Sequence, residues 1–263
     1  MSRSLFFGSR ATESIIPILE STNSKIVGLT NKNHDSNFNA FSPWMAVPSR
    51  MVISPISSTW TPNKRYIDIA ELAEIKNILI SINQEDDLIP SHEQYQLKVS
   101  SLSETEAVHF NAKITEAEKQ LCSILPHFRL LIDSLIQKYI PTESTLTTGT
   151  DFGMSTLWFK GAVFFEKTQN SDLNQRTENI AHEIVHQIII NYQLNDSLIK
   201  GSLNERIYSG IRDEKRPAIL SFHGAAALSY MLWVQSTSPK QPLIISTKLQ
   251  ALAKKRKKEI KAA

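Results

Sequence analysis

The chain has 263 residues and a hydrophobic fraction of 41%, enough for one large domain or two small ones with a substantial core. Its single cysteine, Cys122, excludes an intrachain disulfide framework and favours a reducing compartment. Because the sequence shows neither an apolar signal segment nor a run of 18 apolar residues, we expect a cytoplasmic protein with no membrane partner.

The net charge of +3 is unevenly distributed along the chain. Residues 251–263 carry six Lys or Arg side chains and one Glu, a net of +5, so the first 250 residues sum to −2. A nucleic-acid-binding protein usually carries its basic residues on a folded face. We therefore expect no nucleic-acid partner and interpret the basic tail as a solvated end.

Residues 1–90 are expected to form an irregular N-terminal region followed by a first helix. Four prolines between residues 43 and 62 argue against long helices there. Apolar residues at helical spacing predict the helix at 66–82. We consider this region a candidate for peptide recognition.

Residues 91–242 are expected to form a helical core that contains the metal site. Gln94–Leu102 alternates weakly and suggests a short strand or an extended lead-in. Ser103 and Glu106 match a capping box, and a long helix should follow as far as Pro126. A second helix should open at Pro126 and carry apolar side chains as far as Tyr139.

Residues 154–167 are rich in β-forming side chains and are interrupted by Gly161, which predicts a hairpin or a bent strand pair. After a charged turn, another helix should begin at Pro217. Residues 243–263 are expected to form a last helix that ends in the basic tail. The patterns together predict a mainly helical α+β fold with a small β-sheet or hairpin beside a buried helix.

That buried helix, expected from about Asp172 to Leu194, contains the motif H-E-x-x-H at His182, Glu183 and His186. Residues four apart lie above one another on a helix, so the two histidines can bind one metal ion. The helix is apolar on nearly all sides, which indicates burial. Buried His and Glu side chains are costly unless something satisfies them, so we predict a metal site here.

Two residues are candidates for the third ligand. Glu205 lies 19 residues after His186, a spacing that looks like the glutamate zincins, in which Glu183 would be the general base. His223 lies in an apolar helix next to the small residues Gly224–Ala227, where a histidine needs a partner. We favour His223.

Two arginines suggest an anionic cosubstrate. Arg216 lies seven residues before His223, which in a continuous helix places it on nearly the same face, about 10 Å away. Arg212 precedes it in the loop. Because guanidinium groups bind carboxylates bidentately, a metal at this distance suggests a 2-oxo-dicarboxylate. The alternative is that both arginines pair with surface acids such as Asp213 and Glu214.

Three segments together resemble the HExxH-type peptide β-hydroxylases, which use iron and 2-oxoglutarate and are associated with ribosomally made peptides. The segments are His182-Glu-Ile-Val-His-Gln, Tyr208-Ser-Gly-Ile-Arg-Asp-Glu-Lys-Arg-Pro and Phe222-His-Gly-Ala. The resemblance is clearest over residues 150–236, and the pair Gly210-Ile211 departs from the Pro-Trp-like pair expected there.

The resemblance implies hydroxylation of a side-chain β-carbon in a precursor peptide, with Fe(II), 2-oxoglutarate and O2. The implied metal ligands are His182, His186 and His223. Arg212 or Arg216 would bind the cosubstrate, and Glu183 would orient water, substrate or a neighbouring ligand.

Two other hypotheses remain open. In a zinc metallopeptidase, Glu205 would be the third ligand and Glu183 the base acting on zinc-bound water. In a non-catalytic peptide-binding or scaffold protein, the histidines would be structural.

Overall fold

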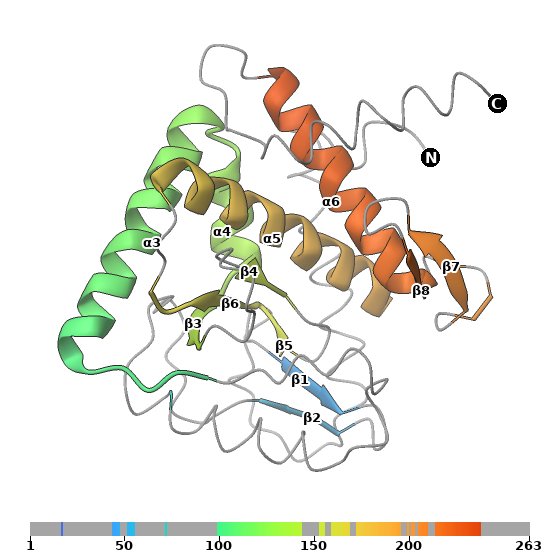
Figure 1. Ribbon diagram of the computed structural model, residues 1–263, viewed down its shortest axis with the longest axis horizontal. Helices are drawn as coiled ribbons and strands as arrows, with labels where there is room; N and C mark the ends of the chain where they lie inside the picture. The colour runs from blue at the N-terminus through green and yellow to red at the C-terminus, as the bar shows by residue number, and fades with distance from the viewer. Residues whose placement is uncertain are drawn as a thin grey trace.

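The computed structural model describes residues 99–143, 153–155, 159–168, 172–195, 201–202, 205–209 and 214–237, two short N-terminal strands, and the single residues Pro17, Leu72 and Ile199 (Figure 1). Four helices dominate this part of the chain, and the strands form small sheets of two or three members. The predicted mainly helical α+β class is therefore confirmed. None of the described helices combines the length and the apolar composition that a membrane crossing needs.

The first of these helices, α3 (Glu104–Ile124), begins at the predicted capping box. Ser103 Oγ accepts a hydrogen bond from the backbone of Glu106 at 3.3 Å, and the backbone of Ser103 donates to Glu106 Oε2 at 2.7 Å. After a turn at Pro126, α4 (Phe128–Leu135) follows. Both helix starts lie within two residues of the predicted positions.

The expected extension of the second helix to Tyr139 is wrong. Lys138–Thr142 instead forms strand β3, which pairs in parallel with β6 (Ala162–Glu166). Four consecutive side chains of β3 are buried, as is typical of a parallel strand covered on both faces. The hydroxyl of Tyr139 donates to Glu118 Oε1 at 2.8 Å, which satisfies both groups inside the core.

The strands predicted at residues 154–167 exist, and β5 and β6 form the bent strand pair of the prediction, interrupted at Gly161, and not a hairpin with one another. Strand β6 lies between β3 and β4 (Gly153–Met154), whereas β5 (Phe159–Lys160) pairs with β1 (Trp44–Val47), which in turn pairs with β2 (Val52–Pro55). Gly161 stands between β5 and β6 with φ at +82°, a conformation that glycine adopts without strain. The chain therefore changes sheets at this glycine.

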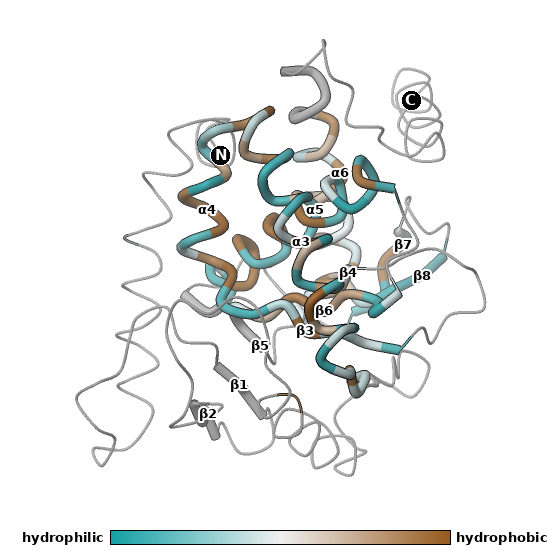
Figure 2. The backbone as a smooth tube through the Cα atoms, turned by 90° about the vertical axis from the view of Figure 1, so that its left-hand side faces the viewer, coloured by the Kyte–Doolittle hydropathy of each residue, from teal (hydrophilic) through white to brown (hydrophobic). Residues whose placement is uncertain are grey.

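Helix α5 (Leu173–Asn195) is the predicted buried helix and packs against α3, α4, α6 and β4. Asp172 Oδ1 accepts from the backbone of Gln175 at 2.9 Å and so caps its first turn. Its apolar side chains lie inside the core: Ile180, Ala181, Ile184, Val185, Ile188 and Ile189. Figure 2 shows hydrophobic segments of β3, β6 and α5 gathered in the centre of the described part.

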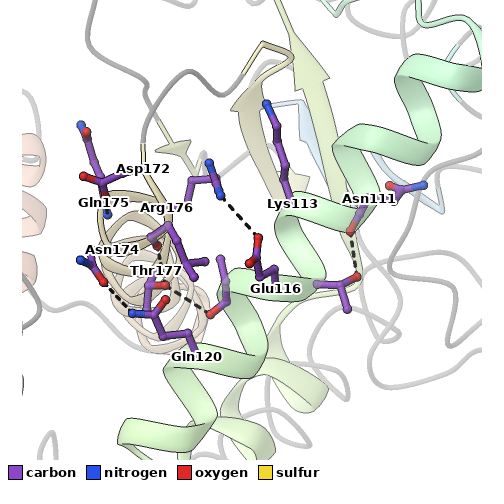
Figure 3. A network of polar contacts seen from close by, with 12 residues as sticks. Asn111, Lys113, Glu116, Gln120, Asp172, Asn174, Gln175, Arg176 and Thr177 are labelled. Atoms are coloured by element: carbon purple, nitrogen blue, oxygen red, sulfur yellow. Dashed lines mark hydrogen bonds and ion pairs between the residues drawn. The ribbon is translucent and has the colours of Figure 1, made fainter. Parts of the chain in front are cut away.

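Polar contacts join the first turns of α5 to α3 (Figure 3). Gln120 Nε2 donates to Asn174 Oδ1 at 2.6 Å, and the hydroxyl of Thr177 donates to its own helix at Leu173 O. Arg176 Nη2 lies 3.7 Å from Glu116 Oε2, but the Glu116 side chain is 60% exposed, so this ion pair contributes little. Apolar burial, together with these contacts, fixes the start of α5 on α3.

Gln187 connects the middle of α5 to the corner between β5 and β6. Its side chain is fully buried; Oε1 accepts from the backbone of Gly161 at 2.8 Å, and Nε2 donates to Ala162 O at 2.9 Å. Because Gln187 follows His186 directly, these two bonds also fix the rotation of the helix at the histidines.

The charged segment before the last helix is a hairpin of β7 (Arg206–Ser209) and β8 (Glu214–Pro217), and α6 (Ala218–Thr237) begins after it. Pro217 is therefore the last residue of a strand and not the first of the helix. Arg216 lies in β8 opposite Ile207, so the helical spacing of about 10 Å predicted between Arg216 and His223 does not apply.

Several expectations fall partly or wholly outside the described residues. Of the helix predicted at 66–82, the structure describes only Leu72, which is helical and buried. Of the extended lead-in predicted at residues 94–102, the structure describes residues 99–102, in which Val99 forms a bridge with Thr142. The helix and basic tail at 243–263 lie outside the description, and so does Arg212.

Replacing Gln187 with Leu, which is similar in size, should destabilise the fold. The change leaves the N–H of Gly161 and the C=O of Ala162 without their partners, at a cost of about 1–3 kcal/mol for each group. Urea unfolding of the variant measures this loss of free energy. The change Gln175→Leu, at an exposed position of the same helix, is the control; equal stability of both variants would contradict the role given to Gln187.

Candidate metal centre

Helix α5 brings His182 and His186 together, one turn apart on the same face. Their Nε2 atoms lie 3.0 Å from one another, and the rings are tilted by 76°. Two imidazole nitrogens that bind the same zinc-like ion at about 2.1 Å lie roughly 3.0–3.4 Å apart. The pair therefore fits a shared metal ion without any change in the backbone.

Glu183 lies next to this pair, and only 2% of it is exposed. One of its carboxylate oxygens and a nitrogen of each histidine all lie within 4.8 Å of one another, whereas Glu183 Oε2 has no hydrogen-bond partner among the described residues. Burial raises the pKa of Glu183 to about 8, with an opposing contribution from Ser155. A buried carboxylate of this kind is costly unless a cation compensates it, which fits a divalent metal ion at the two histidines.

Strand β4 crosses directly over Glu183, and Gly153 makes this possible. A Cβ atom at Gly153 would lie 2.7 Å from Glu183 Cγ and 2.8 Å from Phe165 Cε1. These distances are shorter than side-chain contacts allow, so only glycine lets the strand approach this closely. The carboxylate is thereby covered by backbone on the side of the sheet.

Helix α6 contributes the third imidazole. His223 Nδ1 lies 3.2 Å from His186 Nδ1, and the two rings are stacked with only 15° between their planes. Burial lowers the pKa of His223 to about 4. Burial also lowers the pKa of His186 well below its usual value, as do the neighbouring His182 and His223. Both rings are therefore held neutral, which is the form that binds metal ions.

His186 faces its two neighbours with different ring nitrogens, Nε2 toward His182 and Nδ1 toward His223. A neutral imidazole carries one N–H and has one nitrogen with an available lone pair, so only one of these two nitrogens of His186 can bind an ion. Among the described residues, the cluster of ligand atoms within 4.8 Å of one another accordingly consists of His182, Glu183 and His186, and His223 stands beside it. A single ion bound by all three imidazoles requires a different orientation of at least one ring.

Two other predicted site residues, Glu205 and Arg216, lie outside the cluster of His182, Glu183 and His186. Glu205 is exposed, and its carboxylate is outside the cluster of described ligand atoms; its backbone carbonyl accepts from Ala218 at the start of α6. Arg216 Nε lies 3.4 Å from Glu214 Oε1, which is the pairing with a surface acid considered above. A role of Arg216 in holding a cosubstrate stays a prediction.

Three residues that matter to the site were not identified from the sequence: Gly153, Gln187 and Gln193. Gln193 Oε1 lies 3.2 Å from His223 Nε2. A signal for Gln193 exists in the sequence, because it lies seven residues after His186 and therefore on the same face of α5. Gly153 carries no such signal, since its role follows from the pairing of β4 with β6.

Comparison with known proteins adds no identification. The chain matches no protein-family model, and no curated protein matches it. Its function is therefore inferred from the chemistry of its own side chains.

We expect the metal-free protein to bind one divalent ion per chain when titrated anaerobically with Fe(II) or with Co(II). Replacing His182 and His186 together with Ala should remove this ion, because the cluster then retains only one carboxylate. Metal content after desalting measures the effect. His109→Ala, at an exposed position of α3, is the control and should keep full stoichiometry. Undiminished binding by the double variant would exclude this site.

Proposed function

We propose that the chain is an iron(II)- and 2-oxoglutarate-dependent hydroxylase that acts on a side-chain β-carbon of a ribosomally made precursor peptide. One observation carries the proposal: three imidazoles lie together where α5 packs against α6, with nitrogen contacts of 3.0 and 3.2 Å. His182, His186 and His223 would hold the iron. Three protein ligands leave three of six octahedral positions open for other molecules.

When bound, the iron with 2-oxoglutarate and dioxygen supplies the oxidising power that converts a C–H bond into C–OH, with succinate and carbon dioxide as the other products. The protein would position the bound molecules and shield them from bulk water. Ile184, Val185 and Ile188 are buried, so the other faces of the helix that carries the two histidines are closed to water.

Glu183 has a supporting role in this proposal. Its carboxylate lies close to the ligand nitrogens and under the backbone of Gly153, with Oε2 open to accept a hydrogen bond. From this position it can orient a water molecule or the peptide beside the metal. Arg216 is the described candidate for binding the distal carboxylate of 2-oxoglutarate, which would require it to exchange its contact with Glu214 for the cosubstrate.

A zinc metallopeptidase is the second candidate, and the environment of Glu183 favours it. A buried carboxyl group with a pKa raised to about 8, close to two metal-binding nitrogens, suits a general base that accepts a proton from a metal-bound water. The exposed position of Glu205 argues against the predicted third ligand of this alternative. A peptidase here would have to use His223 instead.

The substitution Glu183→Gln separates the two candidates. In a hydroxylase, the amide keeps the shape and one acceptor oxygen, so the iron-loaded variant should still convert 2-oxoglutarate to succinate. In a peptidase, loss of the base should abolish cleavage, since general-base catalysis is worth about 100- to 10,000-fold. Succinate formation, together with the mass gain of one oxygen atom in a peptide encoded beside the protein, measures the first activity.

The third ligand is tested in the same assay. His223→Ala should weaken metal binding and lower succinate formation by at least about tenfold, whereas Glu205→Ala should change neither. Cleavage of peptides without succinate formation by the iron-loaded wild type would overturn the proposal.

A further inference from the structure

The hairpin of β7 and β8 carries an exposed surface that the chemistry described so far does not use. We infer that this surface binds an acidic segment of the peptide substrate through the side chains of Arg206, Tyr208 and Lys215, all of which are exposed. The inference rests on the proposed function, because it takes a peptide as the substrate of the metal centre.

Two large hydrophobic side chains are exposed next to each other on β7. Ile207 is 41% exposed and Tyr208 is 54% exposed. The other exposed large hydrophobic residues of the described part, Val108 and Leu130, lie singly on α3 and α4. Single exposed apolar residues are ordinary, whereas adjacent ones that include a tyrosine are typical of contact surfaces.

The pairing of the two strands separates the charges of the hairpin. Opposite residues of antiparallel strands share a face, so Tyr208 and Lys215 lie together, and Arg206 is the next residue of β7 on that face. Glu214 belongs to the other face, where it pairs with Arg216. The face of Tyr208 therefore carries two positive charges, and neither β7 nor β8 contributes an acid to it.

A hydrogen bond positions one of these cations beside the other strand. Arg206 Nη2 donates to the backbone carbonyl of Lys215 at 2.6 Å, so the guanidinium lies against β8. A guanidinium has five N–H donors, which allows it to bind a carboxylate as well. Two like charges on one exposed face attract an anion, and the ring of Tyr208 adds apolar contact area. A peptide segment with Asp or Glu next to apolar side chains therefore matches this face.

The hairpin is held close to the proposed metal centre. Helix α6 begins directly after β8, and Ala218 N donates to Glu205 O at 2.8 Å where the two meet (Figure 1). His223 lies six residues after Pro217, which corresponds to about 9 Å along the helix axis. An extended peptide covers about 3.3 Å per residue. One short stretch of peptide can therefore contain both the acidic segment and the residue at the metal.

A peptide array tests the chemistry of this surface with the full-length protein. From short printed peptides of random sequence, we expect the wild type to select those enriched in Asp and Glu. Binding should fall at high ionic strength, because salt screens exposed charges. Lys215→Glu should weaken binding of the selected peptides by at least about tenfold, since like charges then face each other. Tyr208→Ser should weaken it by about tenfold through loss of the aromatic contact.

Two control variants make similar changes elsewhere on the surface. Lys119→Glu reverses a charge at an exposed position of α3, and Val108→Ser removes an exposed apolar side chain from the same helix. Both should bind the selected peptides as tightly as the wild type. In the hydroxylation assay, Lys215→Glu should raise the KM for the peptide at unchanged kcat, because the hairpin binds substrate away from the reacting atoms.

Equal binding of acidic and neutral peptides by the wild type would overturn the inference, and so would unchanged binding in both Lys215→Glu and Tyr208→Ser. Tighter binding of single-stranded DNA than of the acidic peptides would also overturn it, as would a dimer that dissociates in Tyr208→Ser. Failure of the proposed function looks different, because the iron-loaded wild type would then form no succinate. The array still shows in that case whether the hairpin selects acidic peptides.

Discussion

The two hydrogen bonds of Gln187 hold the orientation of α5 on which the metal centre depends. An apolar helix in a core can rotate at little cost when its faces are similar, and α5 is apolar on most sides. The amide of Gln187 removes this freedom, because its two partners are fixed backbone groups at Gly161 and Ala162. The histidine one residue earlier then faces α6, and the helix can carry a site that requires ring positions accurate to fractions of an ångström.

The same requirement explains the local sequence around the motif. Buried polar groups need partners, and the side chain of Gln187 finds them at the corner between β5 and β6. The half-buried Gln193 contacts His223 of α6. Glu183 Oε2 has no such partner in the described part of the chain. Its neighbour Gly153 leaves no room for a side chain above it, and a metal ion bound at the histidines would satisfy this carboxylate.

The sequence correctly predicted those features that depend only on residues a few positions apart. The capping box at Ser103, the extent of α5 and the pairing of His182 with His186 all follow from helical geometry within a few residues. Features set by partners far along the chain were not predictable in this way. Tyr139 belongs to a strand because Val163 pairs with it, and Gly161 separates two sheets because β1, more than a hundred residues earlier, pairs with β5. Arg216 lies in a hairpin, where the pairing of β8 with β7 determines its position. The prediction that it shares a helix face with His223 was therefore wrong.

Anomalous X-ray scattering from crystals of the iron-loaded protein tests the central claim most directly. We predict one iron peak in contact with His182 Nε2 and His186 Nε2, at about 2.0–2.2 Å from each, with a nitrogen of His223 at a similar distance. A peak at which the carboxylate of Glu205 replaces His223, or the absence of any peak at the two histidines of α5, would contradict the account.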